Sequence, residues 1–190
     1  KFFSSINSLG KRLSDYDLIK RHHLRYVLDD KLAEVMSTAW HKMETSGNNI
    51  LSALLNETLY RLRTWRGGGQ PRLDVETSED RPLYRHFSAD IDPLDGYADS
   101  FLPLRFDSIL PGGGVFFKYI EKYRSIYETF LKEPGVVEMR RTFEGHSLGV
   151  LLSGMLPIAF LFYFKFGGLY LNDALYSIVY RVSSLRNETQ

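Results

Sequence analysis

Apolar residues recur at three- and four-residue steps over the first third of the chain, which is the period of an amphipathic helix. The first such run follows Ser14, a residue suited to capping a helix, and lasts to about Thr45. The second runs from about Asn49 to Trp65, and three consecutive glycines follow soon after it. We therefore expect residues 14–66 to form a helical hairpin.

The pattern changes over residues 67–114, where long helices are not expected. This stretch holds five of the seven prolines of the chain, Pro71, Pro82, Pro93, Pro103 and Pro111. It is not a polar linker, because it also carries aromatic and aliphatic residues that need to be buried. We expect an extended arm that packs on the protein's own helices or on a neighbouring subunit.

The helical period returns after the arm. Apolar and charged positions from Val115 to Lys132 predict an amphipathic helix, and a further helix beginning near Val136 is expected to run directly into the segment that follows. Residues 115–146 are read as this amphipathic helix and its lead-in. A short last helix and a tail are predicted for residues 172–190.

Residues 147–164 contain no charged side chain and are apolar on every face of a helix. At about 1.5 Å per residue such a helix covers roughly 27 Å, close to the hydrocarbon core of a bilayer. Aromatic residues gather toward its end, as they do at a membrane interface. The fold predicted is mainly α, with a Pro-rich arm and a single transmembrane helix over residues 147–171. The alternative is the central helix of a soluble α-domain.

Small residues line one side of this segment and predict a helix-packing interface. Gly145, Gly149 and Ser153 are spaced four residues apart, and Gly154 lies beside them. Such a stripe lets two helix backbones approach closely in lipid. The alternative is a close contact with another part of the same chain.

Cations flank the apolar segment on both sides. Arg140 and Arg141 precede it and Lys165 follows it, so all three are candidates for binding anionic lipid headgroups such as cardiolipin. Ordinary flanking charge is the alternative for each of them. The same cations only weakly favour one orientation of the helix.

Bulk composition excludes several classes of protein. The net charge of +1 argues against a nucleic-acid binder, and the absence of cysteine excludes a disulfide scaffold and thiolate metal sites. Residues 1–13 are basic and rich in serine, with no acid. That composition is typical of the end of a mitochondrial transit peptide, or equally of a simple basic arm.

No motif for catalysis, metal binding or phosphate binding is complete. The aspartates Asp90, Asp92, Asp95 and Asp99 fail the spacing of a calcium-binding loop, and no two histidines stand four residues apart. The glycine runs lack the lysine of a phosphate-binding loop. We expect no metal, no cofactor and no small-molecule substrate, and the chain is not expected to be an enzyme.

By elimination, the sequence predicts an accessory structural subunit of a multi-subunit membrane complex, with other subunits and the bilayer as its partners. The inner mitochondrial membrane is the expected setting, in ATP synthase or a respiratory complex of oxidative phosphorylation. Two alternatives stay open. One is a soluble or peripheral helical enzyme that uses His86 and nearby aspartates, and the other is an adaptor anchored at an endomembrane.

Overall fold

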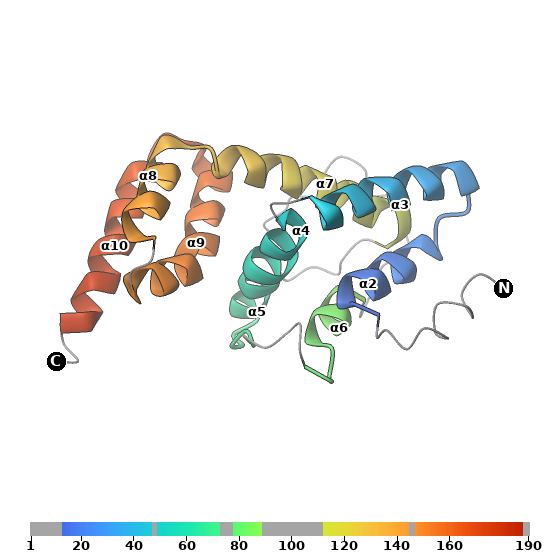
Figure 1. Cartoon of the computed structure of the whole chain (residues 1–190), viewed down its shortest axis with the longest axis horizontal. Coiled ribbons are helices and arrows are strands. Elements are labelled where there is room, and N and C mark those ends of the chain that lie inside the picture. Colours follow the sequence, from blue (N-terminus) through green and yellow to red (C-terminus); the bar gives the residue numbers. More distant parts are fainter. Residues whose placement is uncertain (1–12, 47–48, 73–77, 89–111, 145–146, 188–190) are drawn as a thin grey trace.

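The computed structural model describes residues 13–46, 49–72, 78–88, 112–144 and 147–187, which form helices joined by turns and contain no strand (Figure 1). The prediction of a mainly α fold is therefore confirmed. In chain order the elements are α2 (Asp15–Leu24), α3 (Asp30–Thr45), α4 (Ile50–Ser52), the π-helix η1 (Ala53–Tyr60), α5 (Arg61–Arg66), α6 (Pro82–Ser88), α7 (Gly113–Phe130), α8 (Pro134–Phe143), α9 (Ser147–Phe166) and α10 (Leu171–Asn187).

The prediction of one long helix from Ser14 to Thr45 is wrong, because the helix is interrupted between α2 and α3. Ser14 caps α2 as expected, through a capping box with Asp17. Asp29 then caps α3, and its carboxylate accepts a hydrogen bond from the Leu32 amide at 3.0 Å. The spacing of apolar residues continues through this region without interruption, but the Asp29 cap starts a new helix there.

The second predicted helix is confirmed as one continuous helical segment, built from α4, η1 and α5. Its central part is a π-helix, in which the Thr58 hydroxyl donates to the Ala53 carbonyl at 2.8 Å. The buried side chains of η1 face α6, α7 and α9. This segment therefore lies at the centre of the molecule.

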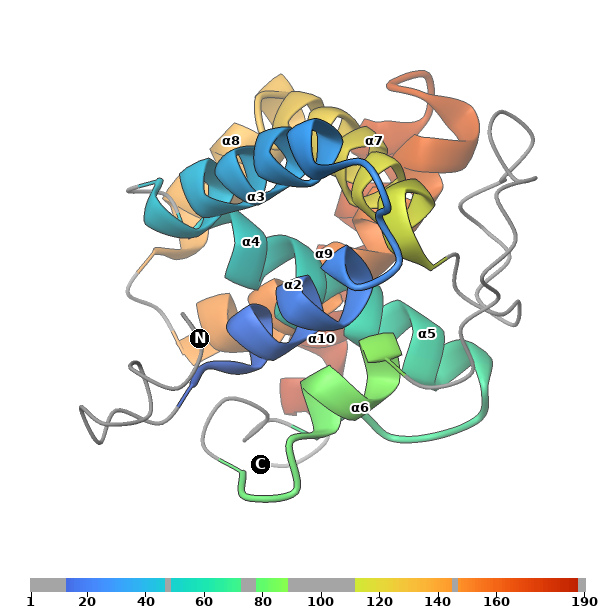
Figure 2. The same ribbon diagram turned by 90° about the vertical axis from the view of Figure 1, so that its right-hand side faces the viewer.

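The core of the N-terminal part forms where α2, α3, α6 and α7 meet (Figure 2). Trp40 of α3 is fully buried against Phe116 and Phe117 of α7. His23 of α2 stacks face to face on the Phe116 ring, with their centroids 3.5 Å apart. Aromatic side chains thus supply much of the apolar area that holds these four helices together.

Helix α6 lies inside the stretch for which the sequence predicted only an extended arm, so that prediction is wrong for residues 82–88. The helix begins at Pro82, a residue well suited to a first helical turn. Asp15 of α2 accepts hydrogen bonds from the Tyr84 amide at 3.1 Å and from Arg81 Nη1 at 3.2 Å. Leu83 and Phe87 are buried. Most of the remaining arm lies outside the described residues.

We expect Asp15→Ala to lower the free energy of unfolding by about 1–3 kcal/mol, because it leaves the partly buried Tyr84 amide without its acceptor and removes the carboxylate partner of Arg81. Urea denaturation followed by circular dichroism measures this loss. Asp80→Ala is the matched control, since Asp80 forms an ion pair with Arg72 at the same 3.2 Å but both side chains are well exposed. The control is expected to change stability by less than about 1 kcal/mol, and equal losses would contradict the prediction.

Helices α8, α9 and α10 pack on one another as a C-terminal unit, at the left of Figure 1. Gly135 of α8 lies so close to α10 that a Cβ there would overlap the Asn172 Oδ1 atom. The sequence predicted that helix α8 would run directly into the apolar segment. That prediction is wrong, because α8 ends at Phe143 and α9 is a separate helix. Phe160 of α9 is buried against Tyr127 and Phe130 of α7, which joins this unit to the rest of the protein.

The predicted membrane span over residues 147–171 is corrected by the structure. Helix α9 ends at Phe166, Gly167 turns the chain with a φ of +65°, and α10 begins at Leu171. Within the described residues, no helix combines the length and the apolar character that crossing a membrane requires. The last predicted helix, by contrast, is confirmed by α10.

Candidate functional site

Helix α9 is apolar on all its faces, yet the chain itself covers only part of it. Pro157, Ala159 and Phe160 are buried, whereas Ile158 and Phe166 are exposed. Helices of soluble proteins that are apolar all round are normally buried on every side. The described part of α9 therefore leaves apolar surface that is not covered by the described residues.

The turn after α9 and the outer face of α10 extend this exposed surface. Leu169 in the turn is 74% exposed, and Tyr176 of α10 is 73% exposed. Tyr176 and Tyr180 stand one helical turn apart and so share a face of α10. We call the whole set the hairpin surface; it consists of Ile158, Phe166, Leu169, Tyr170, Tyr176 and Tyr180.

The predicted small-residue interface is only partly described. Gly145 lies outside the described residues, and for Gly149 and Ser153 the structure describes the helix backbone alone. Gly154 faces the same chain, because a Cβ on it would lie 3.9 Å from Nη1 of Arg61. A Cβ would fit there at ordinary contact distance, so Gly154 lies beside α5 without a close approach that requires glycine.

The three predicted headgroup-binding cations are all exposed but do not converge. Arg141 donates to both carboxylate oxygens of Glu138 on its own helix, at 2.9 and 3.0 Å. The ammonium of Lys165 lies 5.2 Å from the centre of the Phe166 ring. Arg140 lines a groove on another side of α8. The structure therefore does not bring these cations together as one anion site.

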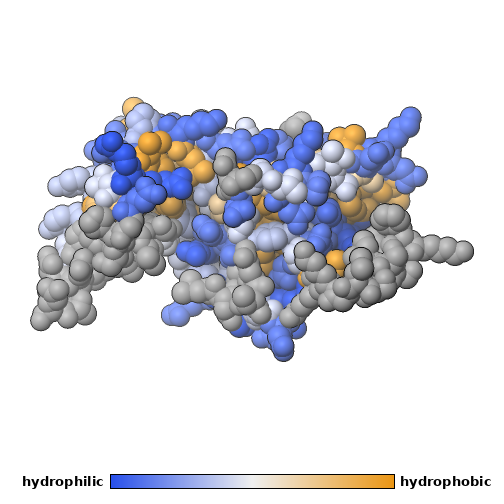
Figure 3. Space-filling model, in the orientation of Figure 1, coloured by the Kyte–Doolittle hydropathy of each residue, from blue (hydrophilic) through white to orange (hydrophobic). Residues whose placement is uncertain are grey.

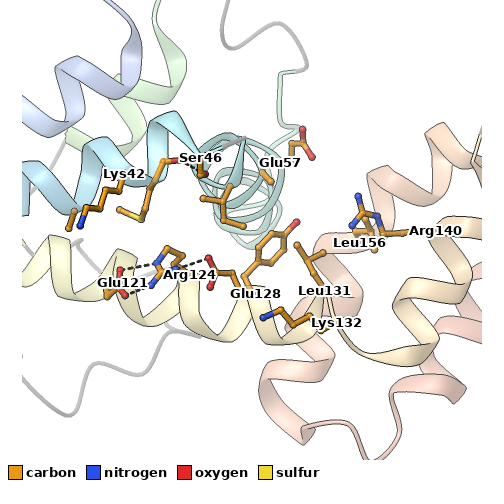
Figure 4. A pocket seen from close by; sticks show the side chains of 15 residues that line it. Lys42, Ser46, Glu57, Glu121, Arg124, Glu128, Leu131, Lys132, Arg140 and Leu156 are labelled. Atoms are coloured by element: carbon orange, nitrogen blue, oxygen red, sulfur yellow. Dashed lines mark hydrogen bonds and ion pairs between the residues drawn. The ribbon is translucent and has the colours of Figure 1, made fainter. Parts of the chain in front are cut away.

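The groove beside Arg140 lies where the N-terminal helices meet the C-terminal unit, and we call it the junction groove (Figure 4). It has a volume of about 980 Å³ and is lined from α3, α4, η1, α7, α8 and α9. Arg124 holds Glu121 and Glu128 on its floor, at 2.9 and 2.6 Å. Lys132, Arg140 and Glu57 add charges of both signs. Because charges of both signs line the groove, it is better suited to polar contacts with another protein surface than to binding a single charged ligand.

Two histidines, the buried His23 and the partly buried His86, hold structural positions. Nε2 of His23 donates to the Phe87 carbonyl at 2.8 Å, and burial lowers the pKa of His23 to about 3. His86 accepts from Nε of Arg63 at 3.0 Å, and burial together with the Arg63 charge lowers its pKa to about 4. Both rings are therefore neutral near pH 7, and each ties two elements together.

The described residues contain no group of three His, Cys, Asp or Glu side chains that could hold a metal ion. The aspartates at positions 90, 92, 95 and 99 lie outside the described residues. Tyr119, Tyr123 and Tyr127, spaced four residues apart on α7, are packed into the interior. The rings of Tyr119 and Tyr123 make an edge-to-face contact with centroids 4.6 Å apart, and those of Tyr127 and Phe160 make another at 5.3 Å. Packing accounts for these tyrosines.

No family model matches the sequence, and comparisons with curated proteins and with solved structures also give no match. The clearest candidate surface, the hairpin surface, was only partly anticipated. The sequence singled out the apolar segment, but it did not indicate that Leu169, Tyr176 and Tyr180 would face outward beside it.

Proposed function

We propose that this chain is a non-catalytic structural subunit of a multi-subunit membrane complex, and that the hairpin surface packs on neighbouring subunits. The observation that carries the proposal is the exposure of apolar and aromatic side chains on α9, its turn and α10. Exposed apolar side chains that gather on one part of a protein mark sites of contact with other proteins or with membranes. Tyrosine in particular is enriched at the centre of protein interfaces.

Helix α8 packs on α9 and α10, and its Val137 is a further exposed hydrophobic residue. Figure 3 places a hydrophobic patch over this region at the left. Permanent interfaces are more apolar than transient ones and resemble a protein core cut in half. The apolar and aromatic side chains exposed on the C-terminal unit support a permanent place in an assembly.

The membrane setting is the finer part of the proposal. Its support is the charge-free sequence of residues 147–164, with Arg140 and Lys165 exposed on either side for anionic headgroups such as those of cardiolipin. The inner mitochondrial membrane, with ATP synthase or a respiratory complex, stays the predicted location. Alkaline carbonate extraction of fractionated mitochondria tests it and also separates integral from peripheral attachment.

Native gel electrophoresis after mild detergent extraction tests the proposal as a whole. We expect the chain to migrate with a complex several times its own mass of 22.0 kDa, together with a constant set of other proteins. A chain that is monomeric, well folded and stable in aqueous buffer at all concentrations would contradict the proposal. Recovery in an endomembrane fraction, bound to one partner, would favour the adaptor instead.

Replacing Leu169 and Tyr176 together with glutamate is expected to remove the chain from the complex. Two carboxylates placed in an apolar interface would be desolvated without a partner, and each carries a penalty of several kcal/mol. The fold itself is expected to be unaffected, because both side chains are largely exposed. The measurement is the fraction of the chain that migrates with the complex, beside the thermal unfolding of the purified variant.

Arg85→Glu is the matched control, since Arg85 is exposed on α6, away from the hairpin surface. It places the same carboxylate on the N-terminal part and is expected to leave migration unchanged. If both variants assemble normally, the hairpin surface is not an interface. If both fall out of the complex, added negative charge is the cause, and the assignment of this surface fails.

The alternative of an enzyme built around His86 receives no support from the described residues. The Nε2 atom of His86 already accepts from Arg63, and its ring packs edge-to-face on Tyr60 and Phe87. The ring is thus engaged in packing and hydrogen bonding between α5, η1 and α6. No specific observation favours a second function over the structural one.

A further inference from the structure

A second exposed apolar surface lies far from the hairpin surface, along α3. Leu28, just before the helix, is 95% exposed, and Val35 is 65% exposed. Within α3, the exposed residues Leu32, Val35 and Ala39 are spaced three and four residues apart, so they form one stripe along the helix, and Leu28 lies just before its start. Hydrophobic side chains also appear over this region at the right of Figure 3.

The stripe borders a groove between α3 and α7, two helices that run side by side along the upper edge of Figure 1. This α3–α7 groove has a volume of about 540 Å³, and Val35 and Ala39 belong to both the groove and the stripe. Its apolar floor is formed by Met36, Trp40 and Phe117. The stripe and the groove therefore form one continuous apolar surface between and along the two helices.

Positive charge lines the α7 side of this groove. Lys118 and Lys122 are exposed there, one turn apart, and within the described residues neither has an ion-pair partner. The nearby Glu121 does not neutralise them, because Arg124 binds both of its carboxylate oxygens, at 2.9 and 2.5 Å. An occupant of the groove thus meets an apolar floor and a basic rim.

We infer that the α3–α7 groove binds an amphipathic helix of another protein, one whose apolar stripe is flanked by acidic residues. A helix laid in a groove anchors side chains at every third and fourth position, and the stripe on α3 offers that same period. Acidic residues beside the stripe would meet Lys118 and Lys122. The inference deepens the proposed function, on which it rests, by naming the chemistry of one partner.

Two other occupants fit the surface less well. A second copy of this chain would bring the same lysines against Lys118 and Lys122, and like charges across an interface oppose association. An anionic membrane would favour the lysines, but a bilayer receives the convex apolar face of a helix lying in its surface. Here Met36, Trp40 and Phe117 line a groove between two helices, which another helix can fill.

Two synthetic helical peptides test the inference with the purified full chain. Both carry the same leucine stripe, and the residues beside it are glutamate in one peptide and lysine in the other. Fluorescence anisotropy is expected to show at least about tenfold tighter binding of the acidic peptide at low salt, from the two rim lysines. Equal binding of both peptides, or binding of neither, would overturn the inference.

Variants of the chain locate the binding. Lys118→Glu combined with Lys122→Glu is expected to reverse the preference between the two peptides, and Val35→Glu to weaken binding of both by about tenfold or more. Circular dichroism should show unchanged folding, because all three side chains are exposed. Leu169→Glu, on the hairpin surface, is the control and should bind like the unaltered chain.

Two further measurements examine the rejected occupants. If vesicles of phosphatidylserine and phosphatidylcholine bind the chain through Val35 and the acidic peptide does not, the surface is a membrane-binding one and the inference fails. A dimer in sedimentation velocity that Val35→Glu abolishes would also overturn it. Peptide binding by the isolated chain does not depend on assembly into a complex, so failure here and failure of the proposed function remain distinguishable.

Discussion

Replacing Trp40 with alanine is expected to lower the free energy of unfolding by about 3–5 kcal/mol. Trp40 is fully buried, and its ring lies against Phe116 and Phe117, with centroid distances of 6.2 and 5.7 Å. Truncation removes this apolar area from the junction of α3 and α7 and leaves a cavity between helices. Stabilities of small domains are themselves about 5–15 kcal/mol, so the variant loses a large fraction of the total.

Urea denaturation followed by circular dichroism measures this effect, and avoids the change in fluorescence that loss of a tryptophan brings. Trp65→Ala is the matched control, because Trp65 is 36% exposed at the end of α5. It removes the same side chain from a partly solvated site and is expected to give a clearly smaller loss. A loss below about 1 kcal/mol for Trp40→Ala would mean that α3 is not held through this contact.

Acidification from about pH 7.5 to about pH 5 is expected to destabilise the fold by roughly 4 kcal/mol through His23 and His86. Burial lowers the pKa of His23 to about 3, and burial with the Arg63 charge lowers that of His86 to about 4. In the unfolded chain both rings titrate near pH 6.5. The unfolded state therefore binds more protons, and stability present above pH 6.5 is lost as the pH falls toward the folded values.

The geometry explains why neither ring accepts a proton easily. His23 already donates from Nε2 to Phe87, and its Nδ1 atom is buried without a hydrogen-bond partner within the described residues, so a charge there would have no compensation. On His86 the Nε2 lone pair is occupied by the Arg63 donor. Protonation would replace that hydrogen bond with a contact between two cations.

Chemical denaturation at a series of pH values measures how the free energy of unfolding changes with pH. His86→Gln keeps an acceptor that Arg63 can reach and removes the titration, so we expect the loss on acidification to fall by about half, or roughly 2 kcal/mol. His41→Gln, at an exposed position on α3, is the control and should leave the slope unchanged. An unchanged slope in His86→Gln would show that this histidine is accessible to protons in the folded protein.

Local signals in the sequence were sufficient to identify most of the helices. Ser14 begins a helix as predicted, α7 follows its apolar period, and α10 occupies the predicted last helix. Each of these depends on spacing and capping within a few residues. A strong cap inside an unbroken period, at Asp29, was the signal that the prediction of one long first helix missed.

Other features required knowledge of which distant segments meet. Helix α6 is held by Asp15, more than sixty residues earlier in the chain. The α3–α7 groove exists only because two helices separated by the whole middle of the sequence lie side by side. No local pattern of residues 82–88 or of Lys118 indicates such contacts.

By itself, the sequence determined that this protein is mainly helical, because helical periods and caps depend on residues that are close together in the sequence. It also determined that one charge-free segment needs burial. The tertiary structure decided how that segment is covered: the chain buries Phe160 against α7 and leaves Ile158 exposed. Burial is a property of the whole assembly of helices, so only the packed fold could distinguish core from interface.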